Sequence, residues 1–150
     1  QYWGKTPGWL TSNNPISPGV KPHYEVQIKS MTRILVIDDN AEFRGMLKTA
    51  LETTGYEVVE AKDGFEGCQL YKNSPSDLVI TDIFMPEKEG LETIRDLIEH
   101  DEKVKIIAIS GGGQHQYTDF LRMSKEFGAS ATLEKPIKIK ELLAKIEELL

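Results

Sequence analysis

The chain has 150 residues, of which 39% are hydrophobic and 28% charged, and its net charge is −6 at pH 7. The length fits one globular domain, and the acidic balance argues against a direct nucleic-acid partner, which would need basic patches. No apolar run approaches the roughly 20 residues that span a bilayer, and the first 30 residues lack a signal-peptide core, so we expect no membrane partner. The single cysteine, Cys68, fits a reducing cytoplasm, because it has no partner for an internal disulfide.

Residues 1–30 differ from the rest of the chain. They contain four prolines, at positions 7, 15, 18 and 22, and show no apolar periodicity before position 26. Met31 then opens a clear strand pattern, so we interpret 1–30 as a leader, upstream or expression-derived, and 31–150 as the folded domain. The alternative is a native arm whose Trp3 and Trp9 dock on the domain or on a neighbouring chain.

The chain after Met31 begins with two strand-then-helix units. Arg33–Ile37 is a short apolar run with β-branched residues, which predicts a strand. Ala41–Thr54 has helical spacing, and Gly55 lies where a helix C-cap is expected. Tyr56–Ala61 predicts a second strand, and Gly64–Tyr71 predicts a short second helix.

Three further units follow. In chain order they are a strand at Leu78–Thr81, a helix at Leu91–Glu99, a strand at Lys105–Ile109, a helix at about 117–127, a weaker strand at Ala131–Leu133 and a helix at Ile139–Leu150. The main strands are apolar without alternation, as strands buried on both faces are. Five such units predict an α/β fold, a doubly wound five-stranded parallel sheet with helices on both faces.

Polar residues stand at four of the predicted strand ends. Asp38 and Asp39 follow the first strand, Asp82 the third and Ser110 the fourth, and Lys135 comes soon after the fifth. Ligands of such sheets bind outside the carboxyl ends of the strands, so we expect these side chains to meet there. Taken singly, each has an ordinary structural role: one aspartate of the acidic pair as a helix N-cap, the serine as a loop start, the lysine as a solvated end. Taken together, they favour a site.

The chemistry of this set is that of phosphoryl transfer. Three neighbouring carboxylates repel one another, and a hard divalent cation such as Mg²⁺ relieves the repulsion with oxygen ligands. A lysine and a hydroxyl beside them can bind the oxygens of a phosphoryl group. A carboxylate can also act as the nucleophile and form an aspartyl phosphate.

Four motifs resemble the response-regulator receiver family, over about Thr32 to Leu150. They are ILVIDDN at 34–40, DLVITDIFMP at 77–86 with Gly90 beyond, ISG at 109–111, and Gly128-Ala129 leading to Lys135-Pro136. Each motif alone is weak, but their order and spacing are highly specific. The resemblance implies the flavodoxin-like strand order 2-1-3-4-5 and a signalling switch in a two-component phosphorelay.

The resemblance also implies roles for single residues. Asp82 is similar to the phosphoacceptor, Lys135 to the lysine that pairs with phosphoryl oxygens, and Ser110 to the hydroxyl residue that moves on activation. The implied partners are a histidine kinase or histidine phosphotransfer protein and a downstream protein target. The peptide bond before Pro136 is often cis in this family.

The implied metal site uses the same aspartates. Asp39 is similar to a direct Mg²⁺ ligand, Asp38 to one that acts through water, and Asp82 to a third ligand. The backbone carbonyl of Phe84 would complete the protein ligands. The side chain of Phe84 is expected near the site, where it would hinder an attacking water and lengthen the lifetime of the aspartyl phosphate.

Two features depart from the family. Receivers usually place Tyr or Phe three residues before the lysine, where this chain has Thr132. The spacing from Ser110 to Lys135 is about three residues longer than usual, and the segment 111–116 absorbs the excess. Both departures concern how a phosphoryl group would be sensed, rather than how it would be accepted.

Other functions fit less well. A phosphatase of the haloacid-dehalogenase kind needs its nucleophile on the first strand in an Asp-x-Asp arrangement, whereas Asp38-Asp39-Asn40 stands there. An unphosphorylated receiver-like module would usually have lost one of the acidic pair, the acceptor or the lysine. Nothing follows the last helix, so we expect either a stand-alone receiver or one domain of a larger protein.

Overall fold

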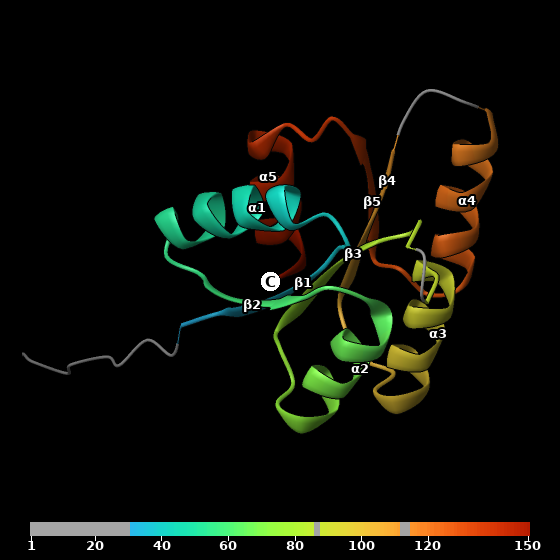
Figure 1. Ribbon diagram of the computed structural model, residues 1–150, viewed down its shortest axis with the longest axis horizontal. Helices are drawn as coiled ribbons and strands as arrows, with labels where there is room; N and C mark the ends of the chain where they lie inside the picture. The colour runs from blue at the N-terminus through green and yellow to red at the C-terminus, as the bar shows by residue number, and fades with distance from the viewer. Residues whose placement is uncertain (1–30, 86–87, 112–114) are drawn as a thin grey trace, which may run out of the picture.

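The structure is a computed structural model, and it describes residues 31–85, 88–111 and 115–150 (Figure 1). Five strands form one parallel sheet in the order β2-β1-β3-β4-β5, which confirms the expected fold. The strands are β1 Arg33–Ile37, β2 Glu57–Ala61, β3 Leu78–Asp82, β4 Ile106–Gly111 and β5 Ala131–Lys135.

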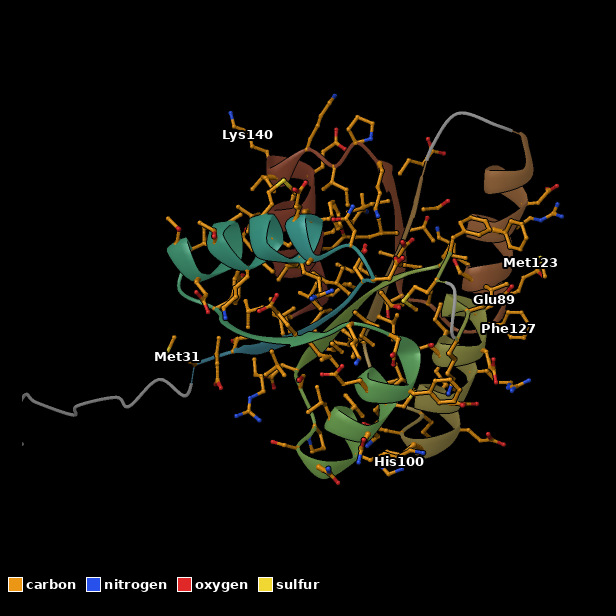
Figure 2. All side chains as sticks on the ribbon, viewed as in Figure 1. Met31, Glu89, His100, Met123, Phe127 and Lys140 are labelled. Carbon is orange, nitrogen blue, oxygen red and sulfur yellow. The ribbon has the colours of Figure 1, made fainter. Side chains whose placement is uncertain are left out.

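Helices cover both faces of the sheet. Those that cover one face are α1 Ala41–Thr53 and α5 Ile139–Leu149; those that cover the other are α2 Gly64–Asn73, α3 Gly90–His100 and α4 His115–Glu126 (Figure 1). Glu89 occupies the N-cap position of α3 without a side-chain hydrogen bond to the helix, and His100 ends it, so the helix runs away from the carboxyl edge of the sheet (Figure 2). The alternation of strands and helices along the chain is what parallel strands joined by helical crossovers require.

The sheet is buried on both faces, which explains why its strands lack alternation. Leu35 and Ile37 of β1 pack into the core under α2 and α3, whereas Ile34 and Val36 pack into the core under α1 and α5. All four are almost completely excluded from solvent. A strand of this kind needs apolar residues at every position.

Side-chain caps define where two of the helices begin. Asn40 Oδ1 accepts hydrogen bonds from the N–H groups of Glu42 and Phe43, at 3.0 and 3.1 Å. The N-cap of α1 is therefore Asn40 rather than either residue of the preceding acidic pair. Asp63 caps α2 in the same way, accepting from the N–H of Glu66 at 2.8 Å.

Three of the five expected strands end earlier than the observed ones, whereas β1 and β2 end at the expected Ile37 and Ala61. Strand β3 continues to Asp82, β4 to Gly111 and β5 to Lys135. Ser110 lies opposite Glu134 in the register between β4 and β5. Pairing along the backbone needs no apolar side chain, so it continues past the point where hydrophobicity stops.

Some expectations fall outside the described residues. The leader at 1–30 and the glycines at 112 and 113 belong to segments that the structure does not describe. Helix α4 begins at His115, two residues before its expected start. In the described part of the chain, none of the helices combines the length and the apolar character needed to cross a bilayer.

Candidate functional site

Three strand ends bring two carboxylates and one ammonium group into contact. Lys135 Nζ donates a hydrogen bond to Asp38 Oδ2 at 3.0 Å and another to Asp82 Oδ2 at 3.4 Å. Strands β1 and β3 are neighbours, with Ile37 opposite Thr81, so the two aspartates that follow lie side by side. The lysine reaches them from β5, two strands further along the sheet.

A third carboxylate completes an acidic cluster. Carboxylate oxygens of Asp38, Asp39 and Asp82 all lie within 4.8 Å of one another. Asp38 and Asp82 are buried, whereas Asp39 is exposed, so the cluster opens to solvent on one side. Hard oxygen ligands in this number suit Mg²⁺, which typically keeps several waters and takes only a few protein ligands. The donor set therefore fits the expected metal.

Burial raises the pKa of the Asp82 carboxyl group. Loss of solvent raises the pKa of the Asp82 carboxyl to about 6, and the negative charge of Asp38 adds to the rise. Lys135 and the N–H of Phe84 act in the opposite direction without cancelling it. A cation beside this carboxylate would favour its ionised form.

The same environment acts on Lys135 in the opposite sense. Burial lowers the pKa of its ammonium group, but the carboxylates of Asp82 and Asp38 outweigh that effect and raise it above the ordinary value. Lys135 therefore stays charged throughout the physiological range.

Two neighbours hold Asp38 in place. The N–H of Asn40 donates to Asp38 Oδ1 at 2.8 Å, which fixes one oxygen of the carboxylate. Arg44 Nη1 donates to the backbone carbonyl of Asp38 at 2.6 Å, and its Nε lies 3.5 Å from Glu60 Oε1. The turn between β1 and α1 is thus tied to both α1 and β2.

Ser110 follows Ile109, the residue paired with Asp82 across β3 and β4, and Phe84 lies two residues after Asp82 in the chain. Ser110 is fully buried at the end of β4, where its Oγ donates to the Gly111 carbonyl at 3.4 Å. The N–H of Phe84 donates to Asp82 Oδ1 at 3.3 Å. The Phe84 ring packs edge to face against Phe120 of α4, with 4.8 Å between centroids. The role of the Phe84 carbonyl as a metal ligand stays a prediction.

Two aromatic residues near the site were missed by sequence reasoning. Lys135 Nζ lies 4.1 Å from the centroid of the Phe43 ring, and Phe120 lies against Phe84. Phe43 is the third residue after the N-cap Asn40, so the sequence indicates that its side chain begins close to the acidic pair. Nothing in the sequence indicates that the ring turns toward β5.

One further expectation is confirmed at the end of β5. The peptide bond between Lys135 and Pro136 is cis. Thr132 is half-buried in β5 opposite Ala108, at the position where the family usually has an aromatic ring.

The fold and the site together define a class of protein. It is a doubly wound α/β domain with a lysine and an acidic cluster at the carboxyl edge of its sheet. Residues 34–147 match the response regulator receiver domain, and the chain belongs to that family.

Curated relatives agree with this assignment. Protein CcdB of Bacillus subtilis is 33% identical over 121 residues, covering 80% of this chain and 98% of its own. The chemotaxis protein CheY of Thermotoga maritima is 42% identical over 83 residues, covering 55% of this chain and 69% of its own. A probable transcriptional regulatory protein of Picosynechococcus is 35% identical over 133 residues, covering 84% of this chain and 52% of its own, so the chain spans about half of that relative's length.

Solved structures share the fold. A CheY-like receiver domain protein of Methanospirillum hungatei has a TM-score of 0.72 at 33% identity, covering 79% of this chain and 93% of its own. A receiver domain protein of Clostridium thermocellum has a TM-score of 0.74 at 29% identity, covering 79% and 94%.

Proposed function

We propose that Asp82 accepts a phosphoryl group from a histidine kinase or a histidine phosphotransfer protein, and that the domain then switches to regulate a partner protein. The observation that carries the proposal is the contact of Lys135 with both Asp38 and Asp82. It supports a site in which one carboxylate reacts while a second and an ammonium group lie beside it. Membership of the receiver family supports the same reaction class.

In the proposed reaction an oxygen of Asp82 attacks phosphorus, and the bond from phosphorus to the donor's histidine nitrogen breaks. The electron pair of that bond goes to the ring nitrogen, which takes up a proton. Lys135 pairs with the phosphoryl oxygens, and the Ser110 hydroxyl donates a hydrogen bond to one of them. Mg²⁺, held by Asp38, Asp39, Asp82 and the carbonyl of Phe84, would supply positive charge to the phosphoryl oxygens.

Acetyl phosphate provides a direct test without a partner protein. With Mg²⁺, the wild type should gain an acid-labile adduct of about 80 Da, as an acyl phosphate requires. Asp82→Ala should show no adduct, whereas Asp119→Ala, which changes an exposed carboxylate on α4, should keep it. An adduct that persists in Asp82→Ala, or multiple turnover of a small phosphate ester, would contradict the proposal.

The relatives and the net charge both bear on the downstream target of the switch. Several of them are named as transcriptional regulatory proteins, and the chain spans about half the length of the first, so transcriptional regulation is not carried over to this chain. We propose a downstream protein target, with no direct contact to nucleic acid or membrane, because the net charge is −6. A cytoplasmic location stays a prediction.

A further inference from the structure

Among the residues that the structure describes, three neighbours of two kinds lie around the ammonium group of Lys135. Two are the carboxylates of Asp38 and Asp82, at 3.0 and 3.4 Å. The third is the Phe43 ring, whose centroid lies 4.1 Å from Nζ. A cation at this distance from a ring face is attracted by the electron density of the face.

The two kinds of neighbour respond differently to a ligand. The carboxylates belong to the acidic cluster that fits a divalent cation, and Asp82 is also the proposed nucleophile. A metal ion would share their charge and repel the ammonium group, because like charges lie close together there. In the proposed site, the ring of Phe43 binds neither the metal ion nor the phosphoryl group.

We propose that Phe43 is the positioning residue for Lys135, holding its ammonium group beside Asp82 once a cation occupies the carboxylates. The inference deepens the proposed function and rests on it. The ring acts through the lysine and touches neither the phosphoryl group nor the metal ion.

The start of α1 fixes the ring in advance. The N–H of Phe43 donates to Asn40 Oδ1, and the N–H of Asn40 donates to Asp38 Oδ1. The half-buried ring also packs against the core cluster that α1 and α5 share. One residue, Asn40, therefore sets the positions of both Asp38 and the ring that faces Lys135.

Phosphorylation by acetyl phosphate at saturating Mg²⁺ tests the role, and this small donor avoids any effect on partner docking. Phe43→Leu keeps an apolar side chain but loses the ring face, and should slow phosphorylation by about 3- to 10-fold. Phe43→Tyr keeps the face and should react like the wild type. The affinity for Mg²⁺ should be the same in all three proteins.

A matched control removes a similar contact elsewhere. Lys88 Nζ lies 5.2 Å from the centroid of the Phe65 ring, and Phe65→Leu removes that ring from an exposed position on α2. This variant should be phosphorylated at the wild-type rate. A wild-type rate in Phe43→Leu, or a Phe43→Tyr variant as slow as Phe43→Leu, would overturn the proposal.

Nuclear magnetic resonance gives a readout that needs no phosphorylation. With Mg²⁺ alone, the ring current of Phe43 should move the Lys135 Hε signals upfield in the wild type and in Phe43→Tyr, and Phe43→Leu should abolish the shift. Equal signals in the wild type and Phe43→Leu would show that the ring does not hold the lysine.

The two measurements distinguish failure of the proposed function from failure of the proposed role of Phe43. A wild type that takes no phosphoryl group defeats the proposed function, while the lysine signals still decide where Lys135 lies. A phosphorylated wild type matched by Phe43→Leu leaves the proposed function standing and defeats the role of Phe43.

Discussion

At the scale of single residues, the pKa of Asp82 has a consequence for stability. Its pKa is raised to about 6, chiefly by burial, so the folded state binds this proton more tightly than the unfolded state. The protonated form is stabilising below about pH 4, and that contribution is lost as the pH rises through about 6. The ionised carboxylate therefore destabilises the metal-free protein at neutral pH.

Asp82→Asn should accordingly stabilise the metal-free protein by about 1–3 kcal/mol at pH 7.5, because the buried charge is gone. The difference should shrink toward zero near pH 4, where the wild-type carboxyl is also neutral. Urea unfolding in the presence of a chelator, at both pH values, measures it. An Asn variant less stable than the wild type at pH 7.5 would show that Lys135 compensates the charge fully.

Phe84 belongs to the same scale. Its N–H bonds to the Asp82 carboxylate, and its ring packs against Phe120. We predict that this ring hinders a water attacking the aspartyl phosphate. Phe84→Asn should therefore lose phosphoryl groups several-fold faster than the wild type. Decay of the 80 Da adduct after removal of acetyl phosphate measures the rate, and an unchanged rate would refute the expectation.

At the scale of secondary-structure elements, the start of α3 is packed tightly against the strand that carries the acceptor. A Cβ on Gly90 would lie 2.2 Å from the carbonyl oxygen of Asp82 and 2.4 Å from Cα of Ile83. The N–H of Gly90 also donates to the Ile83 carbonyl at 2.7 Å. The backbone of Asp82 and Ile83 therefore leaves no room for a side chain at this position.

Gly90→Ala should therefore destabilise the protein by about 1–3 kcal/mol and slow phosphorylation, because the end of β3 must shift. Gly45→Ala is the matched control, since nothing lies within 4 Å of its Cβ position in the middle of α1. It should stabilise the protein by about 0.5–1 kcal/mol through helix propensity. Thermal unfolding of both variants measures the contrast, and equal effects would contradict the close approach at Gly90.

The elements also show what the sequence could predict. Asp38, Asp82 and Lys135 could be placed at one edge because parallel strands direct their carboxyl ends the same way. The contact between Phe43 and Lys135 could not, because it depends on side-chain rotamers and on where the start of α1 lies relative to the end of β5. The ends of β3, β4 and β5 were predicted short, since hydrophobicity stops before backbone pairing does.

At the scale of the whole molecule, metal binding should appear as stability. A ligand that binds only the folded state at 100 times its Kd stabilises it by about 2.7 kcal/mol. Mg²⁺ should raise the Tm of the wild type, and Asp39→Asn should weaken this response, because an exposed ligand of the cluster is lost. Calorimetry with and without a chelator measures both, and a Tm indifferent to Mg²⁺ would contradict the metal site.

Asn40 links the folding of α1 to the assembly of the site. Its side chain caps the N–H groups of Glu42 and Phe43, and its own N–H holds Asp38. If the first turn of α1 opens locally, these amide protons exchange with solvent and the acidic pair loses its support at the same moment. The rate of amide hydrogen exchange at Glu42 and Phe43 therefore measures how often the support of the acidic pair opens.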